Sequence, residues 1–118
     1  MIWYKDSEKR AARAVGGQPS HSIGPDGYKG SKPIEVKSRR EDDRFRIGRD
    51  NHREMVNEHG TYVFNDNGRR ETFTAGQVDR QLKREDREWY DDRREGGQNY
   101  KHTFLYPSDM KEMRKRKR

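Results

Sequence analysis

Apolar side chains are so scarce in this chain that any folded core must be small. Only 15 of the 118 residues are Leu, Ile, Val or Phe, whereas 42% of the chain is charged. Disorder competes with folding at such a composition, and the length suffices for one small domain and not for two. The larger apolar residues nevertheless gather in a central window, where we place the folded centre. They are Ile34, Val36, Phe45, Ile47, Met55, Val56, Tyr62, Val63, Phe64 and Phe73.

The charge balance favours a polyanionic partner. Lys and Arg number 28 against 21 Asp and Glu, which gives a formal charge of +7 and a pI near 9.8. Such an excess ranks nucleic acid before membrane as a partner. The absence of cysteine excludes disulfides and thiolate metal sites. No run approaches the roughly 18 apolar residues of a membrane span, and we expect a soluble, cytoplasmic protein.

Helix and strand signals alternate along the first 40 residues. Residues 6–15 predict a short helix, which the two glycines that follow would end. Glu8 would stand on the otherwise apolar face of this helix. Turn residues between 24 and 30 predict a hairpin, and a more apolar strand over 34–39 follows it.

The next segment continues with a strand, a helix and a hairpin. A helix between strands is typical of a βαβ crossover, which makes at least one pair of strands parallel. We therefore expect an α/β fold in which a small mixed β-sheet is flanked by helices. The predicted elements are a strand over 44–49, a helix over 51–60 capped by Asp50, and a hairpin over 61–74 that turns at Asn67 and Gly68.

The C-terminal part predicts one more helix and a basic tail. Residues 76–95 carry a thin apolar stripe among charged residues, as a solvated covering helix does. The final residues are rich in Lys and Arg, and we expect them to form a flexible tail that attracts phosphates without a fold. Residues 1–95 are thus assigned to one α/β domain, and residues 96–118 to a C-terminal segment.

An acid and a base share one face of the central predicted strand. Because strand side chains alternate, Ile34 and Val36 point one way, and we expect Glu35 and Lys37 to be presented outwards on the other. Asp26 precedes them in the hairpin, so that the chain reads P-D-x8-E-x-K. Two carboxylates on adjacent strands can hold Mg²⁺, which polarises a phosphate and activates water for phosphodiester hydrolysis. The lysine can orient that water or balance charge in the transition state.

The letters "PD" followed by "IEVK" resemble the active-site signature of the PD-(D/E)XK nuclease superfamily. The order of elements, with an acid in the first helix, is most similar to the Holliday-junction resolvases of archaea and archaeal viruses. This resemblance covers residues 7–74. It implies a restriction-endonuclease-like core, Mg²⁺ as the cofactor with Mn²⁺ as a substitute, and a homodimer that makes paired cuts in branched DNA. The catalytic residues that it implies are Glu8, Asp26, Glu35 and Lys37, of which the three acids would be the metal ligands.

Basic residues near this motif are candidate contacts with the DNA backbone. Guanidinium groups beside a metal site can hold phosphates through paired hydrogen bonds. Acidic residues at 41–43 lie among them and could pair with them instead. The predicted DNA-binding residues are Lys32, Arg39, Arg40, Arg44 and Arg46, of which we favour Arg39 and Arg40.

Other interpretations of the same residues stay open. "PDG" is a common turn sequence, and Glu-x-Lys on a strand is ordinarily a solvated face. The chain would then be a non-catalytic basic protein that binds nucleic acid, and within the superfamily a repair or restriction-like nuclease on linear DNA is the alternative. The histidines lack partners at metal-ligand spacing and are interpreted as surface residues: His21, His52, His59 and His102.

Overall fold

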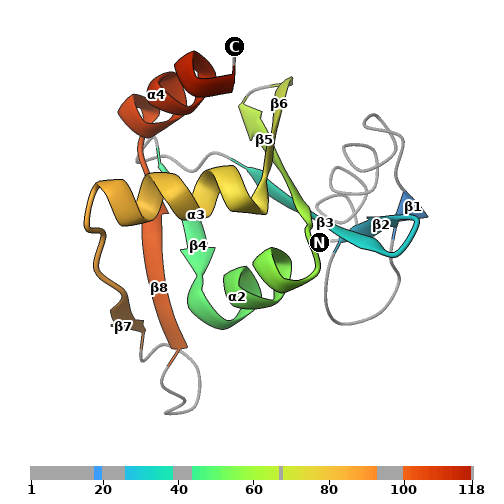
Figure 1. Ribbon diagram of the computed structural model, residues 1–118, viewed down its shortest axis with the longest axis horizontal. Helices are drawn as coiled ribbons and strands as arrows, with labels where there is room; N and C mark the ends of the chain where they lie inside the picture. The colour runs from blue at the N-terminus through green and yellow to red at the C-terminus, as the bar shows by residue number, and fades with distance from the viewer. Residues whose placement is uncertain (1–17, 20–25, 39–43, 67, 93–99, 118) are drawn as a thin grey trace.

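Two β-sheets and three helices make up the part of the chain that the structure describes (Figure 1). The computed structural model describes residues 18–19, 26–38, 44–66, 68–92 and 100–117. The strands are β1 (Gln18–Pro19), β2 (Gly27–Lys29), β3 (Lys32–Ser38), β4 (Phe45–Gly48), β5 (Thr61–Asp66), β6 (Arg69–Thr74), β7 (Tyr90–Asp92) and β8 (Tyr100–Leu105). The helices are α2 (Arg49–Asn57), α3 (Ala75–Arg84) and α4 (Pro107–Lys117).

The strand pairing confirms the predicted α/β class. Sheet A has the order β1-β2-β3-β5-β6, and β3 pairs antiparallel with β2 but parallel with β5. The chain between β3 and β5 contains helix α2, so the predicted crossover and parallel pair are confirmed. Strand β4 belongs to a second, antiparallel sheet B, with the order β4-β8-β7. None of the three helices is both long enough and apolar enough to cross a membrane.

Local sequence explains several turns and helix ends. The predicted hairpin is present as β5–β6, and Gly68 at its turn has a φ of 89°, which glycine adopts without strain. Thr74 caps α3, because its hydroxyl accepts from the N–H of Gln77 while the Gln77 side chain accepts from the N–H of Thr74. Helix α2 has Gly48 as its N-cap, so the predicted cap Asp50 lies in the first turn instead.

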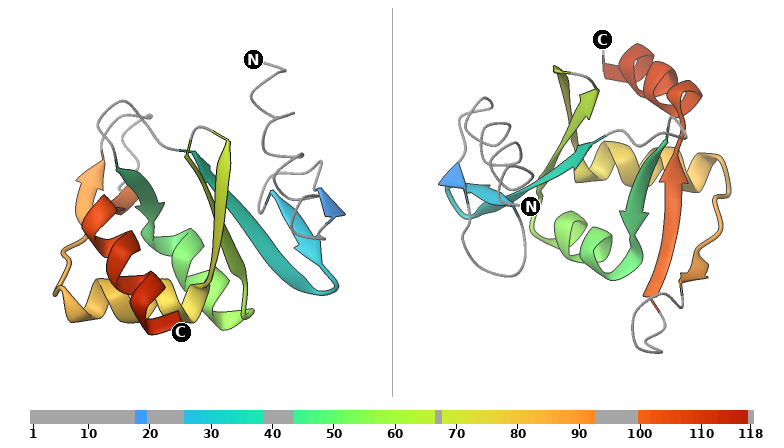
Figure 2. Two further views of the ribbon diagram at one scale, coloured as in Figure 1. Left: turned by 90° about the horizontal axis from the view of Figure 1, so that it is seen from above. Right: turned by 180° about the vertical axis from the view of Figure 1, so that it is seen from behind.

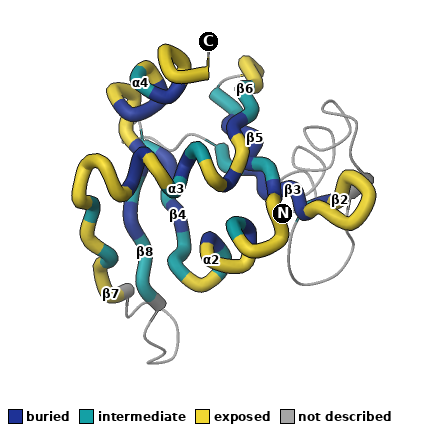
Figure 3. The backbone as a smooth tube through the Cα atoms, viewed as in Figure 1, coloured by how far each residue is buried: buried dark blue, intermediate teal, exposed yellow. Residues whose placement is uncertain are grey.

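The two faces of sheet A have different surroundings. Helices α2, α3 and α4 and sheet B all lie on one side of it (Figure 2). Tyr62 and Phe64 point to this side and belong to the larger buried cluster, while Ile34, Val36 and Val63 form a smaller cluster on the other face. Buried residues run through β3, β4, β5 and β8 (Figure 3).

Strand β3 therefore buries the acid that we expected at the surface. Glu35 and Lys37 pair with Tyr62 and Phe64 in the parallel register and share their face. Glu35 is only 9% exposed, so the expectation that it is presented outwards is wrong. The reason is that β3 lies between β2 and β5, and the crossover helix α2 covers the face that we assigned to solvent.

The C-terminal third departs most from the prediction. The covering helix expected over 76–95 ends at Arg84, and Asp86 with a φ of 47° follows it. Residues 100–105 form strand β8, of which 102–105 pair with β4, and the residues expected to form a flexible tail belong to helix α4 up to position 117. Leu105 and Met110 join the larger buried cluster, so the C-terminal segment completes the core of the residues before it.

Asp109 anchors helix α4 and explains why the tail is helical. It is 2% exposed and accepts hydrogen bonds of 2.8 and 3.0 Å from the guanidinium of Arg87. The backbone N–H of Tyr106 and the side-chain amide of Gln81 donate to the same carboxylate. Arg87 and Gln81 lie 22 and 28 residues away in the chain. The sequence of α4 itself shows mainly an excess of Lys and Arg, so the local pattern did not predict a helix.

We predict that Asp109→Ala destabilises the protein by about 3 kcal/mol. Removing one partner of a buried ion pair leaves the other charge without compensation. The free energy of unfolding in urea measures this loss. Asp91→Ala is the matched control, because Asp91 is exposed and pairs with Lys101 at 3.9 Å, and its loss costs about 0.5 kcal/mol or less. Equal effects of the two substitutions would contradict the anchoring role.

Candidate active site

The β2–β3 hairpin places Asp26 beside Glu35. Gly27 pairs with Ile34, and the same register continued by one residue puts Asp26 opposite Glu35. Oδ2 of Asp26 accepts a hydrogen bond of 2.7 Å from the backbone N–H of Val36, next to Glu35 in β3. A carboxylate has two acceptor oxygens, so this bond fixes Asp26 without using its whole capacity for a ligand.

Glu35 and Lys37 complete the cluster on strand β3. The Lys37 ammonium lies 3.9 Å from Oε1 of Glu35, a distance for charge attraction rather than a hydrogen bond. Asn51 in the first turn of α2 also donates to the Glu35 carboxylate. The second oxygen, Oε2, is buried and has no hydrogen-bond partner among the residues described. A buried oxygen without a donor is rare and indicates a place for a ligand.

The surroundings of Glu35 make its negative charge costly. Burial raises the pKa of Glu35 to about 7, because the charged form loses its hydration. The ammonium of Lys37 and the hydrogen bond from Asn51 act in the opposite direction, while the neighbouring Asp26 raises the pKa further. Up to near-neutral pH Glu35 therefore retains a proton that a divalent cation can replace.

The donor set suits a hard divalent cation. Mg²⁺ binds through one or two carboxylates and keeps several waters, so Asp26 and Glu35 meet its minimum requirement. The orphan Oε2 of Glu35 is the acceptor that such an ion would take up. Within the described ranges no group of three or more His, Cys, Asp or Glu side chains gathers at one point. The third expected ligand, Glu8, falls in the segment before residue 18, outside those ranges.

The other predicted site residues that lie in the described ranges do not join this cluster. Lys32 is exposed on the face of β3 opposite to Glu35. Arg44 precedes β4, and its guanidinium lies 3.7 Å from the centre of the Phe104 ring in sheet B, where Arg46 also pairs with Phe104. Two further predicted DNA contacts lie outside the described residues, and their roles stay predictions: Arg39 and Arg40.

A series of hydrogen-bonded side chains next to the cluster holds helix α2 in place. His52 in α2 is 2% exposed, so its interpretation as a surface residue is wrong. Its Nδ1 lies 2.9 Å from the hydroxyl of Tyr62, and its Nε2 lies 3.0 Å from Oδ1 of Asp79. Lys83 donates to the other oxygen of Asp79 at 2.8 Å. Tyr62 pairs with Glu35 in the sheet, so this chain fixes α2 against the strand beside the cluster.

The donor and the acceptor of each hydrogen bond of His52 follow from the pKa shifts. Burial lowers the pKa of His52, so the ring is neutral. Burial alone would raise the pKa of Asp79, but the hydrogen bonds from Lys83 and His52 outweigh it and lower that pKa. The carboxylate of Asp79 therefore accepts from Nε2–H, and Nδ1 accepts from the Tyr62 hydroxyl.

Sequence reasoning missed the two residues of α2 that serve the site. His52 stands three and four residues before Met55 and Val56, the apolar residues of this helix, and that spacing assigns it to the buried face. Asn51 precedes His52 and interacts with Glu35. No local sequence pattern predicts this interaction. The signal for His52 was present, whereas the role of Asn51 depends on how α2 crosses the sheet.

Comparison with known proteins adds no relative. A scan against protein-family models found no match, and searches of the curated proteins and of the solved structures also returned none. The function of the cluster therefore has to be inferred from its own side chains.

The raised pKa of Glu35 predicts how stability changes with pH. Between the ordinary value of 4.5 and about 7, the folded protein keeps a proton that the unfolded chain has lost. Its contribution to stability is therefore present at low pH and is lost as the pH rises through this window. We compare the free energies of unfolding of Glu35→Gln and the parent without divalent cations. The stability of the variant relative to the parent should rise by about 2–3 kcal/mol from about pH 5 to about pH 8.

Urea unfolding in EDTA at the two pH values measures this difference. Glu54→Gln, on the exposed surface of α2, is the matched control and should change stability equally at both. A Glu35→Gln effect that is independent of pH would show that the buried carboxyl does not hold the proton.

Proposed function

We propose that this protein is a Mg²⁺-dependent endonuclease that hydrolyses phosphodiester bonds in DNA, with branched DNA such as a four-way junction as its substrate. The observation that carries this proposal is the cluster of Asp26, Glu35 and Lys37, in which a buried oxygen of Glu35 has no partner within the described residues. Two carboxylates can hold Mg²⁺ and an ammonium can balance transition-state charge, so these groups suit metal-assisted phosphodiester hydrolysis.

Each member of the cluster has its own part in the reaction. Asp26 and Glu35 would hold the ion through their carboxylate oxygens. Bound Mg²⁺ would polarise the phosphate and lower the pKa of a water molecule. Lys37 places its ammonium beside the carboxylate pair, where it can orient the attacking water and balance the negative charge that grows on the phosphate oxygens.

The supporting residues keep this geometry ready before substrate binds. The backbone N–H of Val36 fixes Asp26, and β3 is held between two neighbouring strands. Asn51 reaches Glu35 from a helix whose own position is fixed by His52. A site built on strands and a buried hydrogen-bonded chain holds catalytic groups more precisely than one built on loops.

Two further features support DNA as the substrate. The chain carries a formal charge of +7, which attracts a phosphate backbone. The order of strands and helix around the cluster also agrees with the order that we expected from the sequence. The preference for branched DNA and the homodimer with paired cuts come from the resemblance alone.

We expect the protein to cut a four-way junction in Mg²⁺ and not in EDTA. Glu35→Ala, Asp26→Asn and Lys37→Ala should each lower the cleavage rate by about 100-fold or more, since each removes a group that acts in the transition state. Asp26→Asn is chosen because the amide oxygen can still accept from the N–H of Val36, which preserves the fold. Rates on labelled junction and linear duplex, with DNA binding measured in EDTA, check these expectations.

The outcomes separate the candidate functions. Faster cutting of linear duplex would favour a repair or restriction-like nuclease. Binding without cutting, or variants as active as the parent, would favour a non-catalytic DNA-binding protein. Glu54→Ala on the outer surface of α2 is the matched control and should cut at the parent rate.

A further inference from the structure

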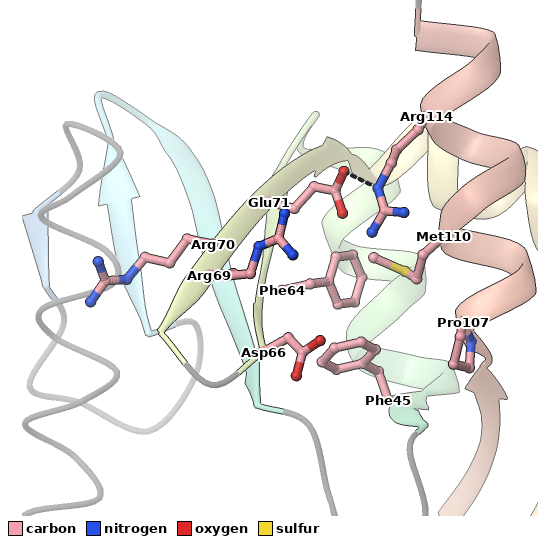
Figure 4. Close-up of a pocket in the computed structure, with 9 residues that line it drawn as sticks. All are labelled: Phe45, Phe64, Asp66, Arg69, Arg70, Glu71, Pro107, Met110 and Arg114. Atoms are coloured by element: carbon pink, nitrogen blue, oxygen red, sulfur yellow. Dashed lines mark hydrogen bonds and ion pairs between the residues drawn. The ribbon is translucent and has the colours of Figure 1, made fainter.

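A cavity of about 300 Å³ lies between the β5–β6 hairpin and helix α4 (Figure 4). Its apolar floor includes Phe64 from β5 and Met110 from α4, and both are buried. Arg69 from the hairpin and Arg114 from α4 line it with cationic groups. The Arg69 side chain lies toward the cavity, whereas Arg70 leaves the hairpin on the other side.

The acids at this cavity neutralise only part of its positive charge. Glu71 pairs with Arg114, and Asp66 at the end of β5 also lines the cavity. Arg69 and Arg70 are exposed, and neither makes an ion pair within the described ranges. The hairpin therefore presents two guanidinium groups that are able to bind an anion.

Helix α4, across the cavity from the hairpin, carries further exposed cations. Lys111 and Lys115 stand one turn apart and are exposed. Glu112, the exposed acid of this helix, pairs with Arg116 instead. The exposed charge along α4 is therefore predominantly positive, and it continues the positive charge of the hairpin.

The cations of α4 belong to a helix that is anchored near both ends. The buried carboxylate of Asp109 anchors one end of α4. Near the other end, Lys117 donates to the backbone carbonyl of Thr72, and its ammonium lies 4.8 Å from the centre of the Phe73 ring. A preformed surface loses less conformational freedom on binding than a disordered basic tail does.

Arg69 and Glu71 of the hairpin lie on the same face of sheet A as the candidate active site. Lys37 pairs with Phe64 across β3 and β5, and Phe64 pairs with Glu71 across β5 and β6. Two strand spacings separate β3 from β6, which is about 10 Å.

We propose that the β5–β6 hairpin and α4 form one cationic surface that binds the phosphate backbone of duplex DNA beside the site of cleavage. Arg69 is its contact on the hairpin, and Lys111 and Lys115 are its contacts on α4. This surface rests on the proposed function for its ligand, and it adds a binding region that the sequence motif does not include.

The dependence of DNA affinity on salt tests this surface. Each phosphate contact contributes about 0.9 to the slope of log K against log salt concentration. We expect Arg69→Gln to make that slope less steep by about 1, and Lys111→Gln/Lys115→Gln to make it less steep by about 2. Binding of a fluorescent duplex is measured by anisotropy in EDTA, so that cleavage does not enter the measurement.

A charge-matched variant separates local contacts from net charge. Lys29→Gln/Arg53→Gln removes two exposed cations from β2 and α2 and should leave the slope close to that of the parent. Arg69→Lys retains the charge and should also keep the slope, which excludes a folding defect. Equal slopes for the hairpin, α4 and control variants would overturn the proposal. Cutting by the parent with unchanged slopes would refute this surface alone, whereas reduced slopes without any cutting would refute the nuclease alone.

Discussion

A carboxyl group in the middle of a β-sheet can stay buried only if its surroundings compensate its charge. Glu35 stands on β3 with strands on both sides and helix α2 over its face. Burial raises its pKa to about 7, and one of its oxygens lacks a donor among the described residues. The neighbouring Asp26 adds to the cost rather than relieving it. The sheet therefore holds an arrangement that stabilises the fold poorly and is suited to a cation.

The rest of the molecule compensates for this cost with buried polar contacts, because apolar side chains are few. Asp109 ties α4 to Arg87, and His52 ties α2 to Tyr62. The first contact joins residues 22 positions apart and the second joins consecutive elements, and both leave their buried groups paired. In a core this small, such contacts decide where the helices lie, whereas in a larger domain the area of apolar contact would decide.

The same polar contacts connect the fold to the proposed chemistry. The hydrogen bonds of His52 hold α2 where Asn51 meets Glu35, and the anchor at Asp109 holds α4 beside the hairpin. The proposed metal site and Arg69 of the proposed cationic surface thus share one face of sheet A, with β5 between them. Cleavage would depend on the metal site, and binding of the DNA backbone would depend on the cationic surface.

The sequence by itself determined the elements with local signals. The alternation in β3, the β5–β6 hairpin and the crossover helix were all predicted, and so was the meeting of Asp26 with Glu35 and Lys37. These predictions succeed because periodicity and turn residues act over a few positions. Tertiary structure alone decided which face of β3 is buried and that the basic tail is a helix. Both depend on contacts between distant residues, such as that of Asp109 with Arg87, which no local pattern encodes.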